Sequence, residues 1–458
     1  MTLIKSISGI RGTIGGTQGE NLTPIDIVEC TAAYGTWLIN SGKTRKIIVG
    51  RDGRISGPQV SQLAINTLLL QGIEVVDLGL STTPTVEMAV KYESAGGGII
   101  FTASHNPKEY NALKFLNEKG EFISGDDGQK ILQLIEDKSL YFCGVEEIGK
   151  LSEGSDYILR HIEDILAIPI LDIELIKDRS FTVVVDCINS TGAISVIPIL
   201  ERLNCKVISI NEEMNGDFAH NPEPLASHLT QLSEAVISNN ADLGIAVDPD
   251  VDRLAFMCED GVLFGEEYTL VAVADFILSR KGGNTVSNLS STRALADVTR
   301  KHGYDYQASS VGEVNVVNLM KETNAVIGGE GNGGVIYPEL HYGRDALVGI
   351  ALFLNLLASK NCTMTELKAT YPHYEMIKDK IQLTRDINVN EVLHVVADAF
   401  KEEKVNKVDG VKIDFEDGWV HLRKSNTEPI IRVYSESKTK ERAEELISLV
   451  RDQIEISN

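Results

Sequence analysis

Short apolar runs alternate with helical patterns over the first two-thirds of the chain, and this alternation limits the folds open to it. Strands are predicted at residues 46–50, 72–77, 181–186 and 243–247, and residues 59–71 have the spacing of a helix. Strands that alternate with helices form parallel α/β sheets. We therefore expect successive α/β units, each with a polar loop after a strand, where ligands gather in such sheets.

The end of the chain has a different pattern. Apolar runs at 411–415, 418–422 and 430–434 predict an antiparallel sheet, and residues 439–454 predict a helix. A chain of 458 residues is too long for one core. The sequence thus predicts three consecutive α/β domains with mixed or parallel sheets and a C-terminal α+β domain. Their expected ranges are 1–155, 156–257, 258–370 and 371–458.

The formal net charge of −23 argues against nucleic acid as a partner, because its phosphates would be repelled. A small phosphorylated ligand is compatible with this charge, since salt screens charges over about 8 Å and the charges near the binding site matter more than the net charge. We therefore expect a local basic cleft inside an acidic protein. Its candidate members are Arg11, Arg51, Arg54, Lys114, Arg253, Arg344, Arg423 and Arg432.

The cysteines and the apolar runs bear on the compartment. The 6 cysteines are scattered without a CxxC pair, which predicts reduced thiols and not a disulfide framework or a cysteine zinc site. No apolar run approaches the length of a membrane helix, and the first residues lack the pattern of a signal peptide. We expect a cytoplasmic protein with no membrane partner.

Residues 100–107, Ile-Phe-Thr-Ala-Ser-His-Asn-Pro, place a serine and a histidine directly after a predicted buried strand. Pro107 forces the chain to turn after Ser104 and His105. A hydroxyl on a tight loop beside an imidazole is suited to be a nucleophile or a phosphoryl carrier. A polar loop without chemistry has the same pattern and remains the alternative from these residues alone.

Asp248, Asp250 and Asp252 stand at alternate positions after another apolar run. Alternate side chains of an extended chain project to the same side, and three carboxylates there suit Mg²⁺. An EF-hand loop begins in the same way, but Arg253 replaces its required glycine and a strand leads in, so we reject it. A haloacid-dehalogenase-type phosphotransferase with Asp248 as nucleophile remains an alternative, as does a solvated acidic turn.

Two later loops also offer ligand contacts. Residues 328–334 are too rich in glycine for a strand, and they present Glu330 and Asn332 to hydroxyl groups. The loop lacks the GK[ST] ending of a nucleotide-binding loop. A second turn, residues 423–429, has the composition of a phosphate cradle, with Arg423, Ser425, Asn426 and Thr427 as its polar members. A flexible turn and a polar hairpin are the plain alternatives.

Together these segments resemble the α-D-phosphohexomutase superfamily, and phosphoglucosamine mutases within it. The resemblance covers the phosphoserine loop at 102–107, the metal loop at 248–253, the sugar loop at 329–334 in part, and the phosphate loop at 423–429. Residues 8–12 and 50–54 are similar to the opening motifs, and the motifs follow one another in the order of the family. The metal loop departs by Pro249 in place of a glycine.

The resemblance implies four domains around a central cleft, with one Mg²⁺ per active site. Ser104 would carry the phosphoryl group and complete the metal site of Asp248, Asp250 and Asp252. The catalytic residues carried over are Ser104, His105, Lys114, Arg11 and Arg253. The substrate-binding residues are Glu330, Asn332, Arg423, Ser425, Asn426, Thr427 and Arg432.

The implied activity is the interconversion of hexose 6-phosphate and 1-phosphate through a phosphoserine enzyme and a 1,6-bisphosphate. Glucose or glucosamine 1,6-bisphosphate would be the activator, and the protein would be a monomer or a homodimer. Val311-Gly-Glu313 resembles the segment of phosphoglucosamine mutases, which favours glucosamine phosphate. Asn332 and Gly334 replace a serine and a histidine of the family, so glucose and mannose phosphates remain open. A haloacid-dehalogenase-type phosphatase and a non-catalytic sugar-phosphate sensor rank below these mutases.

Overall fold

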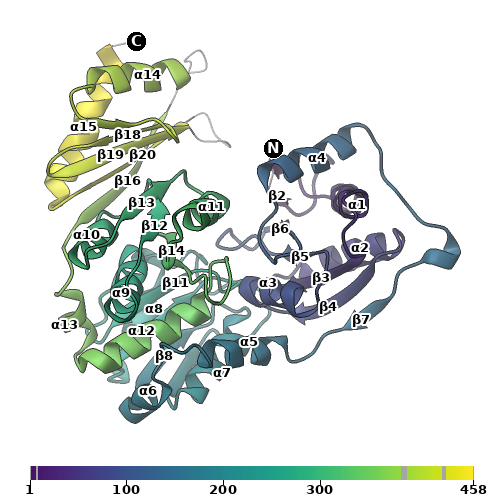
Figure 1. The fold of residues 1–458 in the computed structure, drawn as a ribbon, viewed down its shortest axis with the longest axis horizontal. Coiled ribbons are helices and arrows are strands. Elements are labelled where there is room, and N and C mark those ends of the chain that lie inside the picture. Colours follow the sequence, from purple (N-terminus) through teal and green to yellow (C-terminus); the bar gives the residue numbers. More distant parts are fainter. Residues whose placement is uncertain (1, 7–8, 383–388, 425–429, 457–458) are drawn as a thin grey trace. The chain divides into compact units, whose positions relative to one another are not determined.

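A computed structural model describes residues 2–6, 9–382, 389–424 and 430–456 of the chain (Figure 1). The chain forms two compact units. Unit 1 comprises Met1–Phe276 and Asn332–Leu367, and unit 2 comprises Ile277–Gly331 and Lys368–Asn458. The chain therefore leaves unit 1, returns to it and leaves it again, so that neither unit is one continuous segment.

The first sheet of unit 1 has the strand order β1-β2-β6-β5-β3-β4-β7. Its strands are β1 (Ile4–Ser6), β2 (Gly9–Thr13), β3 (Lys46–Arg51), β4 (Glu74–Leu80), β5 (Gly97–Phe101), β6 (Tyr110–Leu116) and β7 (Leu151–Glu153). β5, β3, β4 and β7 are parallel neighbours, whereas β6, β2 and β1 pair in antiparallel fashion. The helices of this part are α1 (Pro24–Asn40), α2 (Gly57–Leu69), α3 (Thr83–Tyr92) and α4 (Gly125–Glu136), followed by the 3₁₀ turn η1 (Val145–Glu147).

Alternation along β3 explains why helices cover both faces of this sheet. Ile47 and Val49 belong to a core that also holds residues of α1, α2 and α4, whereas Ile48 belongs to a second core with residues of α3. Successive side chains of a strand point to opposite faces, and here both faces are buried. Apolar residues therefore run continuously through β3 instead of alternating with polar ones.

The second sheet of unit 1 has the order β11-β10-β8-β9, with β11 antiparallel to its neighbour. Its strands are β8 (Thr182–Asp186), β9 (Lys206–Ile210), β10 (Leu243–Val247) and β11 (Leu254–Cys258). The surrounding elements are α5 (Tyr157–Leu166), α6 (Ile173–Arg179), α7 (Gly192–Arg202), η2 (Ala226–His228) and α8 (Thr230–Ser238). The returning segment contains β15 (Gly334–Ile336), which is not a strand of this sheet, α12 (Ala346–Lys360) and the start of α13 (Met364–Lys368). Phe353 of α12 stacks on Phe256 of β11, with ring centroids 3.8 Å apart.

Unit 2 holds two further sheets. α9 (Glu266–Arg280) enters the unit, and β12 (Thr285–Asn288) lies between β13 (Tyr306–Ser309) and β14 (Ile327–Glu330), with α10 (Ala294–Lys301) and α11 (Glu313–Thr323). The last sheet is antiparallel, in the order β16-β20-β19-β18-β17. Its strands are β16 (Glu375–Gln382), β17 (Lys404–Asn406), β18 (Val411–Asp414), β19 (Gly418–Lys424) and β20 (Ile430–Ser437). Apolar residues of α14 (Val389–Ala399) and α15 (Lys440–Ile456) form one core with this sheet (Figure 1).

These elements confirm the predicted fold class of three α/β parts followed by an α+β part, whereas the exact domain limits stay a prediction. The prediction that segment 328–334 is too rich in glycine for a strand is wrong, because the segment contributes the end of β14 and the start of β15. A Cβ atom on Gly328 would lie 2.5 Å from Sδ of Met320, so glycine permits close packing against α11. No helix in the described ranges has the length and apolar character needed to cross a membrane.

Candidate active site

The loop after β5 places Ser104 at the end of a buried strand, as predicted. Ser104 has a φ of +48°, in the left-handed region, and only 6% of its surface is exposed. Its backbone N–H donates to Oγ1 of Thr102 at 2.9 Å, and the Thr102 hydroxyl donates to Oδ2 of Asp52 at 2.7 Å. The unusual backbone conformation is therefore held by hydrogen bonds that reach back to Asp52, the residue after β3.

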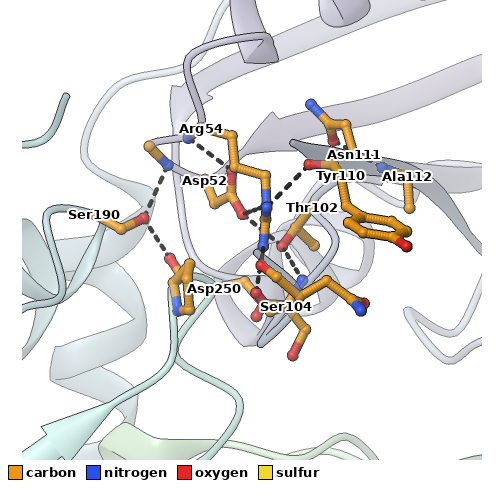
Figure 2. A network of polar contacts seen from close by, with 12 residues as sticks. Asp52, Arg54, Thr102, Ser104, Tyr110, Asn111, Ala112, Ser190 and Asp250 are labelled. Atoms are coloured by element: carbon orange, nitrogen blue, oxygen red, sulfur yellow. Dashed lines mark hydrogen bonds and ion pairs between the residues drawn. The ribbon is translucent and has the colours of Figure 1, made fainter. Parts of the chain in front are cut away.

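The guanidinium group of Arg54 fixes the same loop from inside (Figure 2). Its side chain is fully buried and is ion-paired to Asp52 through Nε at 3.0 Å. Nη2 donates to the carbonyl oxygens of Ser104 and Asn106 at 2.5 and 2.6 Å. Nη1 donates to those of Pro107 and Tyr110 at 2.7 and 2.9 Å. All five N–H donors of an arginine side chain are thus used, four of them on the segment that carries Ser104.

The three aspartates lie in the connection between β10 and β11, and all three side chains have no exposed surface. The connection is a turn and not the extended chain that we expected. Oδ1 of Asp248 accepts the backbone N–H groups of Asp252 and Arg253 at 3.1 and 3.0 Å, and Val251 has a φ of +60°. The turn brings one oxygen of each carboxylate to within 4.8 Å of the others.

The Ser104 loop and the aspartate turn meet in unit 1. Oγ of Ser104 donates to Oδ2 of Asp248 at 2.5 Å. Nζ of Lys114, on β6, lies 2.9 Å from Oδ2 of Asp250 and 3.7 Å from Oδ2 of Asp252. These contacts bring together residues that the sequence assigned to the reaction and to the metal.

Two further side chains complete the surroundings of the aspartates. The hydroxyl of Thr83, at the start of α3, donates to Oδ2 of Asp250 at 2.6 Å. Nη2 of Arg344 lies 2.7 Å from Oδ2 of Asp252. Within the described residues, the Oδ1 atoms of Asp250 and Asp252 are buried and have no hydrogen-bond partner. Buried carboxylate oxygens without a partner fit a hard cation such as Mg²⁺, which these three aspartates would hold.

The pKa values of Asp248 and Asp250 are shifted in opposite directions. Burial and the neighbouring Asp252 and Asp250 raise the pKa of Asp248 well above its usual value. Burial also acts to raise the pKa of Asp250, but Lys114, together with hydrogen bonds from Thr83 and Asp248, outweighs this effect and the pKa of Asp250 is lowered overall. Three buried carboxylates repel one another, so a divalent cation between them would relieve a cost that Lys114 and Arg344 offset only in part.

His105, Arg11 and Arg253 also lie at this site. Nδ1 of His105 is 3.4 Å from Oγ of Ser104, and Nη1 of Arg11 donates to Oδ1 of Asn106 at 3.0 Å. Burial lowers the pKa of His105 to about 2, and the charges of Arg253, Arg344, Arg11 and Lys114 act in the same direction. Four members of the predicted basic cleft thus lie near His105, whereas Arg423 and Arg432 belong to unit 2. Arg54 is an exception, because it serves the loop backbone instead of facing a ligand.

The predicted sugar and phosphate residues fall mainly in unit 2. Oε1 of Glu330 accepts from Nδ2 of Asn288 at 2.9 Å and from the backbone N–H of Gly312 at 3.1 Å. Oδ2 of Asp409 is ion-paired to Nε of Arg423 at 2.8 Å and accepts the N–H of Val311 at 2.9 Å. The segment around Gly312 is thus tied to Glu330 on one side and, through Asp409, to Arg423 on the other.

The remaining predicted residues are placed only in part. Arg432 is exposed on β20, opposite Arg423 in the strand register. Asn332 belongs to unit 1, where its Oδ1 is buried without a hydrogen-bond partner in the described chain. Ser425, Asn426 and Thr427 lie outside the described residues.

Sequence reasoning missed Thr83 and Asp52. Thr83 begins a helix beside a proline and carries no signal of its own. Asp52 lies in the segment 50–54 that resembles an opening motif of the superfamily, and this resemblance was the available signal, but it said nothing of the residue's role.

Comparison with known proteins identifies the family. Four family models cover almost the whole chain: phosphoglucomutase/phosphomannomutase α/β/α domain I at residues 3–142, domain II at 159–261, domain III at 265–374 and the C-terminal domain at 378–453. The chain therefore belongs to the phosphoglucomutase/phosphomannomutase family of the α-D-phosphohexomutase superfamily. It is an enzyme of the isomerase class, an intramolecular phosphotransferase that acts on sugar phosphates.

Individual relatives agree with this assignment. The chain is 36% identical over 445 residues to a phosphoglucomutase/phosphomannomutase of Thermococcus kodakarensis, covering 96% of each chain. It is 33% identical over 461 residues to a phosphoglucosamine/phosphogalactosamine mutase of Sulfurisphaera tokodaii, covering 98% of each. A crystal structure of a phosphoglucomutase/phosphomannomutase family protein from Burkholderia thailandensis has the same fold, with a TM-score of 0.86 at 24% identity over 100% of this chain and 98% of that one.

Proposed function

We propose that the protein interconverts hexose 6-phosphates and 1-phosphates with Ser104 as the phosphoryl carrier. One observation carries the proposal: Oγ of Ser104 lies 2.5 Å from Oδ2 of Asp248, within a trio of buried aspartates and beside Lys114. A hydroxyl next to a cation site and a lysine is the arrangement that phosphoryl transfer needs, because charge on the transferred group must be stabilised.

The reaction has two halves. In the first, the bond between phosphorus and Oγ of phosphorylated Ser104 breaks, a bond to a sugar hydroxyl oxygen forms, and the proton of that hydroxyl passes to Oγ of Ser104. In the second, Oγ of Ser104 gives up its proton and bonds to the phosphorus of the other phosphate of the 1,6-bisphosphate, whose bond to the sugar oxygen breaks, and that oxygen takes up the proton. His105, Lys114 and Arg11 are the candidates to move these protons. Bound Mg²⁺ would supply positive charge next to the phosphoryl oxygens.

Glucosamine phosphate is the substrate that we propose first. The Val311-Gly-Glu313 segment resembles that of phosphoglucosamine mutases, and its Gly312 N–H donates to the sugar-loop residue Glu330 at 3.1 Å. This contact supports the proposal that both segments contact the same sugar. One relative is named for glucosamine and galactosamine phosphates and another for glucose and mannose phosphates, so phosphoglucomutase or phosphomannomutase activity is the alternative.

Several finer features belong to the same proposal. We propose glucose or glucosamine 1,6-bisphosphate as the activator that restores lost phosphoserine, one Mg²⁺ per active site, and a monomer or homodimer as the working form. The domain limits 1–155, 156–257, 258–370 and 371–458 are proposed as well. A cytoplasmic location is supported by the cysteines, which form no disulfide within the described residues.

A coupled assay of the purified protein tests the function. Glucosamine 6-phosphate, glucose 1-phosphate and mannose 1-phosphate are compared at equal concentration with Mg²⁺ and catalytic bisphosphate. The proposal expects turnover of all or some of them, with the highest kcat/KM for glucosamine 6-phosphate. Highest kcat/KM for another sugar would correct the substrate, and no turnover of any would leave a sugar-phosphate sensor.

Replacing the carrier tests the mechanism. Ser104→Ala removes one hydroxyl group and should abolish turnover, while Ser238→Ala, on the exposed end of α8, serves as the matched control with normal rates. Intact mass should show a phosphoryl group on wild type and none on Ser104→Ala. Normal rates in Ser104→Ala, or a hydroxylamine-sensitive acyl phosphate on Asp248, would replace the mutase mechanism by that of a haloacid-dehalogenase-type phosphatase.

A further inference from the structure

A second cluster of ionisable side chains lies in unit 1 and shares no residue with the Ser104 site. Glu87 comes from α3, His161 from α5, and His341 and Asp345 from the segment that leads into α12. Each of the four residues has at most 5% of its surface exposed. Buried ionisable groups are costly unless they are paired or bind a metal, so the cluster requires an explanation.

The two imidazole rings converge on one oxygen atom. Oδ2 of Asp345 lies 3.1 Å from Nε2 of His161 and 3.3 Å from Nε2 of His341. Its other oxygen, Oδ1, accepts the backbone N–H groups of Leu347 and Val348 and caps α12. One ligand atom from each of the three side chains lies within 4.8 Å of the other two. Three potential ligand atoms therefore surround one point.

The other nitrogen of each ring is occupied by a separate polar group. Nδ1 of His161 lies 3.1 Å from Oγ1 of Thr85, and Nδ1 of His341 lies 3.2 Å from Oε2 of Glu87. Proteins orient metal-binding histidines with one nitrogen on the metal and the other hydrogen-bonded to a hydroxyl, carbonyl or carboxylate oxygen. His161 has this hydrogen bond, whereas His341 has a close contact to a carboxylate without hydrogen-bond geometry. Thr85 and Glu87 both come from α3, so one helix positions both rings.

The distances suit ligands around an ion, and they are longer than the usual hydrogen bond between charged groups. Charge-assisted N–H···O bonds are usually about 2.7–2.9 Å long. The pair of His220 and Asp186 in the same chain is of this kind, with 2.8 Å between Nε2 and Oδ2. Around Zn²⁺ with bonds of about 2.0–2.1 Å, neighbouring tetrahedral ligand atoms are separated by about 3.3 Å. The separations of 3.1 and 3.3 Å at Asp345 match that edge.

The charges of the four side chains also favour a dication. Glu87 and Asp345 are acidic. Burial acts to lower the pKa of His341, but in the absence of a metal the two carboxylates outweigh burial and raise this pKa to about 9, so that a protonated His341 offsets only one of the two negative charges. A divalent cation bound by neutral His161 and His341 cancels both. Imidazole ligands favour Zn²⁺ and its neighbours over Mg²⁺, which prefers oxygen.

We propose that His161, His341 and Asp345 form a Zn²⁺ site, with Thr85 and Glu87 orienting the two histidines and a water molecule as the fourth ligand. The site joins α3, α5 and the start of α12. The segment that carries Asp345 also contacts the aspartate turn. The N–H of Ala346 donates to the carbonyl of Val251 at 3.2 Å, and Arg344 pairs with Asp252. Zinc would thereby hold the segment that presents Arg344 to the Mg²⁺ ligands.

Metal retention by the full-length protein tests the site without an activity assay. The protein is stripped with a chelator, loaded with ZnCl₂ in a large excess of MgCl₂, desalted, and analysed for metal content. We expect about one equivalent of zinc to be retained, because a buried site releases its metal slowly. If no zinc remains after desalting, the proposal is overturned and the cluster is a hydrogen-bonded network without a metal.

Substitutions locate the zinc. His161→Gln and His341→Gln should each lose it, whereas Asp248→Asn, in the Mg²⁺ trio, and His220→Gln, at the ordinary histidine–aspartate pair, should retain it. Equal retention in all four variants, or loss only in Asp248→Asn, would place the metal elsewhere and overturn the assignment. If the histidine variants fail to fold, Co²⁺-loaded wild type decides: the intense visible absorption of tetrahedral cobalt is expected, and a spectrum of octahedral cobalt refutes the site.

Discussion

Arg54→Lys is the substitution for which the structure predicts the most definite cost. Lysine keeps the positive charge opposite Asp52 but has three N–H donors where arginine has five. At least two of the acceptors that Arg54 now serves therefore lose their donor. These acceptors are Oδ2 of Asp52 and the carbonyl oxygens of Ser104, Asn106, Pro107 and Tyr110.

The magnitude follows from the number of lost donors. A buried acceptor without a donor costs about 1–3 kcal/mol, so two of them cost about 2–6 kcal/mol. Three of the contacts to carbonyl oxygens are only partly buried, and water can replace part of what they lose. We therefore expect the free energy of unfolding of unit 1 to fall by about 2–4 kcal/mol. Turnover should fall further, because Ser104 loses the support of its loop.

Urea unfolding measures this change if the signal comes from unit 1. The chain has 2 tryptophans, Trp37 in unit 1 and Trp419 in unit 2, so wild type and variant are compared in a Trp419→Phe background. Arg202→Lys is the control, because Arg202 also lies in unit 1 and makes its ion pair with Glu163 on the surface, where such pairs contribute about 0–1 kcal/mol. An Arg54→Lys protein that unfolds at the same urea concentration as its parent would refute the account of the loop.

Two further predictions concern phosphate binding and pH. Arg423→Ala should raise the KM for sugar phosphate about 10–100-fold, from the loss of a charged hydrogen bond of about 1.5–3 kcal/mol, and should leave the Mg²⁺ requirement unchanged; equal losses in both would contradict its role as a phosphate ligand. Burial acts to lower the pKa of His220, but Asp186 outweighs this and raises the pKa overall. The pair therefore stabilises the fold fully below the unfolded pKa of about 6.5 and loses this effect as pH rises through the folded pKa, so stability should fall more between about pH 6 and 9 in wild type than in His220→Gln.

The sequence predicts elements well where a pattern is local. β10, expected at 243–247, spans Leu243–Val247, and the helix expected at 439–454 is α15, Lys440–Ile456. The aspartate trio is also predictable from a local pattern, since its members follow one another at alternate positions. They converge through a turn with a left-handed Val251, however, and not through an extended strand, which alternation alone cannot distinguish.

Features built from distant segments could not be predicted. The sequence predicts that Arg54 belongs to the basic cleft. In the structure its acceptors on residues 104–110 are backbone carbonyl groups, which every residue has and which therefore give no signal in the sequence. His161 and Asp345 are 184 residues apart, and each alone is an ordinary polar residue. The glycines of β14 argue against a strand in the sequence, because the reason for Gly328, the approach of Met320, is a tertiary contact.

The return of residues 332–367 to unit 1 has a consequence for how the protein is made. The helix α12 in this segment is buried along nearly all of its length, and its Phe353 covers Phe256. Residues 1–276 emerge from the ribosome before α12 is synthesised. The apolar surface that α12 covers in the finished protein is therefore exposed in the nascent chain during this time. We expect truncated chains that stop before α12 to aggregate, and nascent chains to need chaperones until translation has passed this helix.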